Sequence, residues 1–228
     1  MKNNFFLATI IISALVAFAS VDVAAEKKQP QNSSKEVIAG VQAKYEKTTD
    51  IRASFEQVTT MPGGRRLQAS GQAFFKKPNM IRWDFVKPEA QAIITDGRTM
   101  WLYEPTEKQV QVYDAKMLDA RLRMGFFSDL RRLEEDFTIC MGGLVERCNV
   151  LELEPKPDRG LDMRHITLLI SVNPTRVVEA RVTDATGNLT TIKFSAIKEN
   201  TGIKDSVFKF SPPAGVRVIK PAMQGLGL

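Results

Sequence analysis

The chain has 228 residues, a quarter of them charged, and a formal net charge of +6. This length suits one globular domain once an N-terminal leader is set aside. The basic residues stand in scattered pairs such as Arg65-Arg66, Lys76-Lys77 and Arg131-Arg132. Scattered pairs are typical of a solvated surface, so the pattern argues against nucleic acid as a partner, while an acidic partner or an anionic membrane surface stays open.

The first 25 residues predict a secretory signal peptide. Lys2 precedes an almost unbroken apolar run from Phe5 to Ala19, and small residues end at Ala25, where a signal peptidase would cut. A buried N-terminal helix is the alternative, although nothing amphipathic interrupts the run. A lipid anchor would need a cysteine at the cleavage point, and the first cysteine is Cys140. We therefore expect an exported, unanchored chain.

The mature chain is expected to begin with a flexible lead-in, residues 26–36, followed by a short helix. Ile38, Val41 and Tyr45 recur on one face of a helix expected over 35–48, with Ser34 as its N-cap. Alternating apolar and polar residues then predict antiparallel strands, and Asp96-Gly97 predicts a hairpin turn. These strands are expected over 51–59, 67–75, 81–85, 92–103 (a hairpin) and 108–113.

The period changes to that of a helix over 115–133, where Leu118, Leu122 and Phe126 recur every four residues. Strands resume afterwards, with a hairpin turn at Gly187-Asn188. They are expected over 137–141, 149–153, 165–172, 177–183, 189–195 and 207–210. Consecutive hairpins without βαβ crossovers predict a mainly β fold with helices. The sheet is expected to curl into an unclosed antiparallel β-barrel, or half-barrel, covered by an α-helical lid.

The inner face of such a half-barrel would carry Phe55, Trp83 and Phe85, together with the leucines of the helices. Two interpretations are open on physical grounds. The apolar faces of sheet and helices could fill each other as an ordinary packed core, which is the commoner outcome. They could instead leave a cavity for an apolar ligand.

The only two cysteines, Cys140 and Cys148, bracket a turn that is predicted at Gly142-Gly143. In an oxidising compartment a close pair of this kind predicts a disulfide across a hairpin. Zinc is the alternative, but with the sole histidine, His165, only three soft ligands exist, so we expect no metal site and no cofactor. A redox-active pair is disfavoured because the spacing is not C-x-x-C.

Residues that could carry catalysis are few. One histidine excludes most arrangements of base and nucleophile, and no Gly-x-Ser-x-Gly elbow occurs. Ser-x-x-Lys occurs at 195–198 and 206–209, in strand-like runs where residues three apart point to opposite faces. The carboxylates at 134–136 are expected to end a helical segment in water. The sequence therefore predicts a binding protein rather than an enzyme.

Five motifs occur in order along the chain: F-x-Q at 55–57, then "ASGQAFFKKPNMIRW", "QAIITDGRTMWLYEP", "KQVQVY" and "VFKFSPPAGVRVI". Their order and spacing resemble the LolA family of periplasmic lipoprotein carriers. The resemblance implies one domain over 37–219 with a tail at 220–228, folded as an unclosed antiparallel β-barrel under a helical lid.

The resemblance also implies a function and its partners. Carriers of this family are monomers that take lipid-modified lipoproteins from an inner-membrane lipoprotein-releasing ABC transporter to a receptor lipoprotein on the outer membrane. The acyl chains of the cargo lie in an apolar cavity. In this chain the implied lining is Tyr45, Ile51, Phe55, Ile81, Trp83, Phe85, Leu118, Leu122 and Phe126.

A basic residue before the proline of the Lys76-Lys77-Pro78 corner latches the empty lid in that family. The matching residue is Lys77, where the best-known members have arginine, so a mobile ammonium replaces a planar fork of donors. Two other functions stay open: a carrier of the same fold for another hydrophobe, such as a glycolipid, and a lipid-sensing regulatory module that binds a membrane signalling protein.

Overall fold

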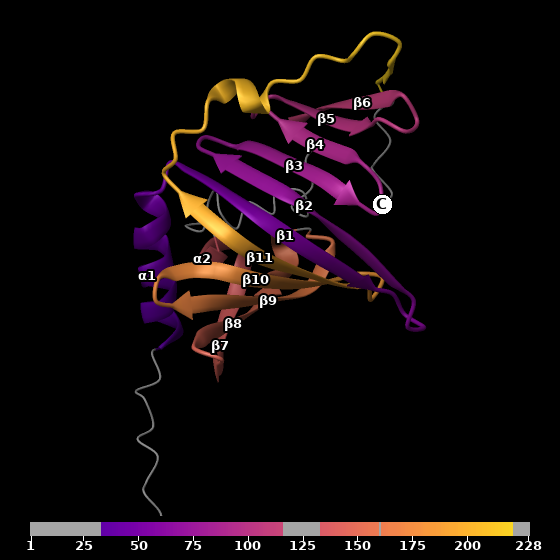
Figure 1. Ribbon diagram of the computed structural model, residues 1–228. Coiled ribbons are helices and arrows are strands. Elements are labelled where there is room, and N and C mark those ends of the chain that lie inside the picture. The colour runs from indigo at the N-terminus through magenta and orange to yellow at the C-terminus, as the bar shows by residue number, and fades with distance from the viewer. Residues whose placement is uncertain (1–32, 116–132, 160, 221–228) are drawn as a thin grey trace, which may run out of the picture. The chain divides into compact units, whose positions relative to one another are not determined.

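One continuous sheet organises the chain in this computed structural model, which describes residues 33–115, 133–159 and 161–220 (Figure 1). All of them belong to one compact unit, Gln31–Leu228. The helical elements are α1 (Ser34–Glu46), α2 (Leu133–Asp136) and the 3-10 turns η3 (Pro157–Arg159) and η4 (Asp205–Phe208). The strands are β1 (Asp50–Thr60), β2 (Arg66–Lys76), β3 (Met80–Lys87), β4 (Gln91–Thr95), β5 (Thr99–Glu104), β6 (Gln109–Asp114), β7 (Phe137–Val145), β8 (Cys148–Pro155), β9 (Met163–Val172), β10 (Thr175–Asp184), β11 (Leu189–Glu199) and β12 (Arg217–Ile219).

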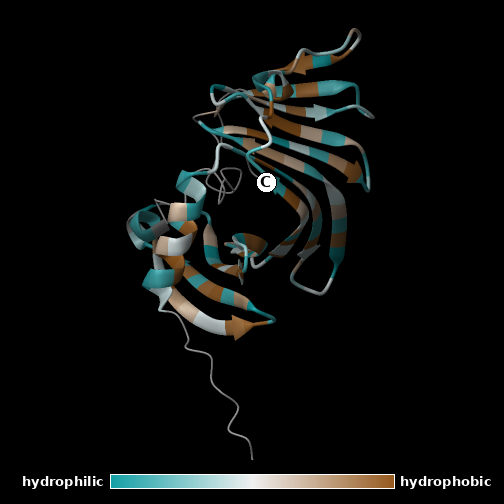
Figure 2. Cartoon of the chain, turned by 60° about the vertical axis from the view of Figure 1, so that its left-hand side comes forward, coloured by the Kyte–Doolittle hydropathy of each residue, from teal (hydrophilic) through white to brown (hydrophobic). Residues whose placement is uncertain are grey.

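The sheet has twelve strands in the order β12-β6-β5-β4-β3-β2-β1-β11-β10-β9-β8-β7. Neighbouring strands are antiparallel, except that β12 runs parallel to β6. Strands β12 and β7 stand at opposite ends of this order, so the sheet is unclosed. Figure 2 shows it strongly curved, with α1 on its concave side. The predicted fold class, an unclosed antiparallel half-barrel, is confirmed.

The strands form where one set of alternate residues can be buried. In β3, Ile81 and Trp83 are buried while Arg82 between them is only half-buried, as a period of two requires. The predicted Asp96-Gly97 turn joins β4 to β5, and Gly97 has a φ of 91°, which favours glycine. The turn predicted at Gly187-Asn188 joins β10 to β11.

Helix α1 begins one residue earlier than the sequence analysis predicts. Its N-cap is Ser33, whose Oγ accepts the Glu36 N–H while the Glu36 carboxylate accepts the Ser33 N–H. This is a capping box, and it selects Ser33 over Ser34 because Glu36 stands three residues after Ser33. The buried face of the helix joins the core beneath the concave sheet; it consists of Val37, Ile38, Val41 and Tyr45.

The chain after β11 crosses the opposite, convex face of the sheet, and we call residues 201–219 the C-terminal strap (Figure 1). The strand predicted over 207–210 is wrong, because Val207 and Phe208 belong to the 3-10 turn η4 and residues 209–210 are in no strand. Phe208 is fully buried, and the ring of Phe210 lies 5.0 Å from that of Tyr103 and 6.3 Å from that of Trp101. The two alternate phenylalanines of "VFKF" are therefore apolar because they fix the strap to the sheet, and not because they belong to a strand.

The hairpin of β7 and β8 corrects two further predictions. Gly142 and Gly143 lie inside β7 at a bulge, and the turn is made by Glu146 and Arg147, which both have positive φ. In this register Cys148 pairs with Val145 and Cys140 with Glu152.

The predicted disulfide is therefore wrong: both thiols are free. Cys140 lies five residues from Val145, the partner of Cys148, which along a strand places the two Cα atoms more than about 10 Å apart. A disulfide needs Cα atoms within roughly 7 Å. The expectation fails because the hairpin turn lies at Glu146 and Arg147 and not at Gly142-Gly143, which shifts the register of the two cysteines.

The helix predicted over 115–133 falls almost entirely on residues 116–132, outside the described part of the chain. Its last residues enter α2, which contains the carboxylates 134–136. Among the described residues, none of the helices has the length and apolar character needed to cross a membrane.

Candidate functional site

The concave face of the central strands carries a cluster of aromatic rings, which we call the aromatic cluster. Its centre is Trp83 on β3, whose ring lies 4.7 Å from Phe55, 5.6 Å from Phe75 and 6.1 Å from Phe194 between centroids. Phe85 completes it, 5.1 Å from Phe55. Edge-to-face contacts of this kind add stability beyond area burial. Four strands, β1, β2, β3 and β11, thus build one apolar surface.

The pairing register explains why these rings meet. Phe55, Gly71 and Phe85 are direct cross-strand partners on β1, β2 and β3. A Cβ added at Gly71 would lie 1.9 Å from the Asp84 carbonyl oxygen and 3.0 Å from Phe55 Cε1. Gly71 therefore leaves the space in which the two phenylalanine rings approach each other across β2.

The predicted cavity residues that the structure describes come together on this side of the sheet. Ile51, Phe55, Ile81 and Trp83 are at most 7% exposed and share one hydrophobic cluster. Phe85 is half-buried and packs against it. Tyr45 joins the cluster from α1. The remaining predicted residues, Leu118, Leu122 and Phe126, lie outside the described residues.

The sequence analysis missed several apolar residues of the same face. Phe75 and Phe194 belong to the aromatic cluster, and Ile93 packs beside it. Phe75 pairs with both Ile51 and Ile81. The signal was present for Phe75 and Ile93, because extending the two-residue alternation from Trp83 onto its hairpin partners β2 and β4 would have placed these two side chains on the inner face.

Lys77 reaches from the β2–β3 corner to the C-terminus of α1. Its ammonium donates hydrogen bonds to the carbonyl oxygens of Tyr45, at 2.5 Å, and Glu46, at 3.2 Å. The last carbonyls of a helix have no intrahelical donor and carry partial negative charge, so a cation there satisfies and stabilises them. A backbone hydrogen bond from Lys77 N–H to the Thr49 carbonyl fixes the corner beside the helix end.

Lys76 points the other way, as alternation requires. Its ammonium binds the Ile203 carbonyl at 2.6 Å and the Asp205 carboxylate at 2.5 Å, both on the C-terminal strap. The two lysines of the corner thus hold different elements: Lys77 holds α1 and Lys76 holds the strap.

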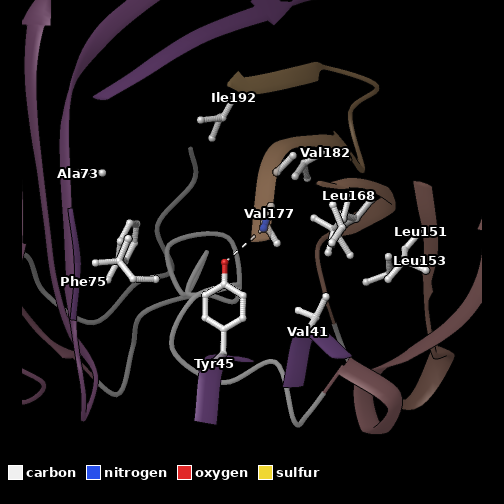
Figure 3. Close-up of a cluster of buried hydrophobic side chains, with 14 of the residues drawn as sticks. Val41, Tyr45, Ala73, Phe75, Leu151, Leu153, Leu168, Val177, Val182 and Ile192 are labelled. Atoms are coloured by element: carbon white, nitrogen blue, oxygen red, sulfur yellow. Dashed lines mark hydrogen bonds between the residues drawn. The ribbon is translucent and has the colours of Figure 1, made fainter. Parts of the chain in front are cut away.

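Tyr45, whose carbonyl oxygen accepts from Lys77, also makes a hydrogen bond inside the core through its side chain (Figure 3). Its phenol oxygen accepts the N–H of Val177 on β10 at 3.3 Å. Burial, together with the nearby Glu199 carboxylate, raises the pKa of Tyr45 well above its usual value, against the opposing effects of the Val177 hydrogen bond and Arg176. The phenol is therefore neutral at physiological pH, and it ties the end of α1 to the sheet.

Asp50, at the start of β1, pairs with Lys76 of the β2–β3 corner. Its carboxylate is buried and accepts the Thr201 N–H and hydroxyl, at 2.8 and 2.9 Å, and the Gly202 N–H at 3.0 Å. Burial alone would raise the pKa of Asp50, but these hydrogen bonds and one from Thr49 outweigh it and hold the pKa below its usual value. The carboxylate remains charged and joins β1 to the beginning of the strap.

The lone histidine takes part in a polar row on β8 and β9. His165 Nε2 lies 2.6 Å from Glu152 Oε2, which also accepts the Thr167 hydroxyl at 2.7 Å. Within the described ranges, no group of three or more histidine, cysteine or carboxylate side chains could hold a metal ion. The apolar side chains of the concave face can bind an apolar ligand.

Sheet, aromatic cluster and capped helix define an unclosed β-barrel with an apolar concave face. Residues 46–211 match the family model of the outer membrane lipoprotein carrier protein LolA, and the chain belongs to this family. A similar relative is the outer-membrane lipoprotein carrier protein of Dechloromonas aromatica, 32% identical over 174 residues, which cover 75% of this chain and 82% of the relative. The protein of the same name from Methylococcus capsulatus is 31% identical over 171 residues, covering 75% and 81%.

A solved structure supports the fold. An uncharacterized conserved protein from Thermus thermophilus superimposes with a TM-score of 0.55 at 12% identity, covering 82% of this chain and 98% of that one. This likeness concerns the fold alone.

Proposed function

We propose that the protein is a periplasmic carrier that binds the acyl chains of lipoproteins released from the inner membrane and delivers them to an outer-membrane receptor. The observation that supports this most is the aromatic cluster on the concave face of an unclosed sheet, in a chain whose relatives are named outer-membrane lipoprotein carrier proteins. The acyl chains would lie against Ile51, Phe55, Ile81, Trp83 and Phe85, with Tyr45 on α1 and Leu118, Leu122 and Phe126 from the predicted lid.

The energetics of carrying acyl chains suit such a surface. Each methylene costs about 0.8 kcal/mol when left in water, so a soluble carrier must cover many of them at once. A face without aimed hydrogen-bonding groups binds chains of different length without strict geometry. Aromatic and aliphatic side chains of the cluster meet that requirement.

Release requires that the empty carrier close on itself. We infer that Lys77 latches α1 over the sheet in the empty state through the Tyr45 and Glu46 carbonyls. Loading would then have to displace contacts within the protein. A carrier whose empty state is stabilised in this way hands its cargo on more readily.

Location and partners follow from the same proposal. Residues 1–25 would direct export and be cleaved near Ala25, leaving one carrier domain over 37–219. The partners would be an inner-membrane lipoprotein-releasing ABC transporter and a lipid-anchored receptor on the outer membrane, with the carrier acting as a monomer. The function is binding and transfer, not catalysis.

The test is to identify what the protein carries. The chain is exported in a Gram-negative host, purified without detergent, and its bound molecules are identified by mass spectrometry. Triacylated N-terminal peptides are expected. A glycolipid in their place would contradict the lipoprotein assignment and favour the alternative carrier of the same fold.

Two adjacent residues provide a matched pair of variants for that experiment. Phe85→Glu places a charge on the concave face at a half-buried position, whereas Val86, 65% exposed, is the extra residue at the register shift between β2 and β3 and already faces water. Phe85→Glu should therefore be recovered without bound lipoprotein and Val86→Glu with it. Equal loading of the two variants would mean that acyl chains do not lie on the concave face.

A further inference from the structure

The concave face changes from aromatic to mixed polar and apolar along the length of β1 and β2. Its cross-strand rows run in steps of about 6.6 Å. One row pairs Ala53 with Ala73 and Trp83, and the next pairs Phe55 with Gly71 and Phe85. Beyond Phe55, the inner positions of β1 are Gln57 and Thr59, which pair with Ala69 and Leu67 on β2. The aromatic cluster thus ends at the row of Phe55 and Phe85, and amide and hydroxyl groups join the apolar side chains beyond it.

A groove begins where the aromatic cluster ends. It has a volume of about 540 Å³ and lies between the far half of the β1–β2 hairpin and the tips of the β3–β4 and β5–β6 turns. This volume falls within the range of ligand pockets. Its lining combines apolar side chains such as Leu67, Ala69 and Pro88 with polar ones, Gln57, Thr59, Gln91 and Glu104.

Phe85 connects the two regions. Its ring contacts Phe55 and Trp83 of the aromatic cluster, at 5.1 and 6.5 Å between centroids, and it also lines the groove. Gln91, the cross-strand partner of Phe85 on β4, stands on the groove side of the same row. A molecule that passes from the aromatic cluster into the groove therefore meets an uninterrupted surface.

The charges of the groove limit what its polar part can hold. Two cations, Arg66 and Lys87, face three carboxylates, Glu89, Glu104 and Glu107, which gives a net charge of −1. An anionic phosphate headgroup would require an excess of cations. Amide and hydroxyl groups on Gln57, Gln91 and Thr59 instead offer both donors and acceptors, which is what a peptide backbone needs.

We propose that this groove binds the extended polypeptide that directly follows the acylated residue of a bound lipoprotein. The proposal rests on the proposed function, because only a lipoprotein cargo joins acyl chains to a peptide. The acyl chains would lie on the aromatic cluster, and the linkage between lipid and peptide would cross the row of Phe85. The amides of Gln57 and Gln91 bond the first peptide groups of the cargo.

The experiment compares two synthetic ligands on purified, delipidated protein. One is a triacylated cysteine amide without a peptide, and the other carries the same cysteine followed by a short, uncharged peptide. The variants are the double change Gln57→Ala with Gln91→Ala and the control Gln72→Ala. Gln72 lies on the convex face of β2, where it bonds Ser54.

The wild-type protein should bind the peptide-bearing ligand more tightly than the peptide-free one. Loss of two neutral hydrogen bonds should weaken binding of the peptide-bearing ligand about tenfold. The double variant should bind the peptide-free ligand like wild type, and Gln72→Ala should bind both ligands like wild type. Equal affinity of wild type for both ligands, or equal weakening of both by the double variant, would overturn the groove assignment. Failure of wild type to bind either ligand would contradict the proposed function instead.

Discussion

Lys77 is one of the residues that hold the C-terminus of α1. Its ammonium is the donor for two of the last carbonyls of the helix, and Thr48 supplies a third bond through its hydroxyl to the Lys44 carbonyl at 2.9 Å. A lysine reaches these carbonyls with three rotatable donors, so it needs no planar fork. A lysine is therefore sufficient for the observed contact with α1.

We predict that Lys77→Leu weakens the empty, closed state. A charge-assisted hydrogen bond contributes about 1.5–3 kcal/mol when it is partly buried. The variant should accept lipoprotein from the transporter more readily and pass it to the receptor less well, because only the empty state loses a contact. Transfer between inner-membrane and receptor-bearing vesicles measures both steps.

The matched control is Lys47→Leu, since Lys47 is exposed and directly follows α1. Lys76→Leu is unsuitable because Lys76 holds the C-terminal strap. Loading and transfer that are the same in Lys77→Leu and Lys47→Leu would show that the hydrogen bonds of Lys77 do not latch α1 in the empty state.

Asp50 makes stability depend on pH in the acid range. The pKa of its carboxyl is lower in the folded than in the unfolded chain, so the carboxylate stabilises the fold above the unfolded pKa of about 3.9. We predict that the free energy of unfolding decreases as the pH falls below about 4. Asp184, whose pKa is lowered to about 2 by Thr186 and Asn188 against the effect of burial, contributes in the same direction.

Urea unfolding measured at several acid pH values tests this in wild type and Asp50→Asn. The variant should be less stable near neutral pH and should lose less stability on acidification. A wild-type pH dependence retained in full by the variant would mean that other carboxyls cause the effect.

At the scale of elements, alternation in the sequence predicts the central strands well because they bury one face only. The register of β1, β2 and β3 follows from Ile51, Phe55 and Trp83 being required on one side. Prediction fails where backbone conformation departs from residue preference. The β7–β8 turn uses Glu146 and Arg147 at positive φ, which their residue types do not signal.

Contacts between residues that are far apart in the chain could not be predicted from the sequence, and the two lysines of the β2–β3 corner illustrate this. Alternation predicts that Lys76 and Lys77 point to opposite faces, and they do. Nothing local indicates that residues 203 and 205 return to meet Lys76, 127 and 129 positions later. The candidate lining was predictable on β1 and β3, whereas Phe194 required knowledge that β11 pairs with β1.

Two glycine substitutions should change stability in opposite directions. At Gly71 an added methyl group would overlap the Asp84 carbonyl and crowd Phe55, so Gly71→Ala should destabilise the protein by at least about 2 kcal/mol. At Gly40, in α1, a Cβ meets no atom within 4 Å, so Gly40→Ala should stabilise it by roughly 0.5–1 kcal/mol through helix propensity. Denaturant midpoints measure both; a tolerated Gly71→Ala would show that β2 and β3 can separate at little cost.

In the whole molecule, the convex and concave faces of the sheet contact different parts of the chain. The convex face of β3 to β6 is closed by the C-terminal strap, which buries Phe208 and covers Trp101 with Phe210. The concave face carries the aromatic cluster and leads into the groove lined by both polar and apolar side chains. A sheet fastened on its outside can keep its curvature while its inner face exchanges one set of apolar contacts for another. The two tryptophans of the chain stand on these two faces.

This placement lets fluorescence distinguish the faces when cargo is bound. Trp83 lies in the aromatic cluster and Trp101 against Phe210 of the strap. A lipopeptide with brominated acyl chains should quench Trp83 strongly, because bromine quenches an indole only at close approach. The Trp101→Phe variant, which reports Trp83 alone, should lose most of its emission, whereas Trp83→Phe, which reports Trp101, should keep it. The same lipopeptide without bromine controls for changes in conformation. Quenching of Trp101 with an unaffected Trp83 would place the acyl chains on the convex face and contradict the assignment of the concave face as the carrier surface.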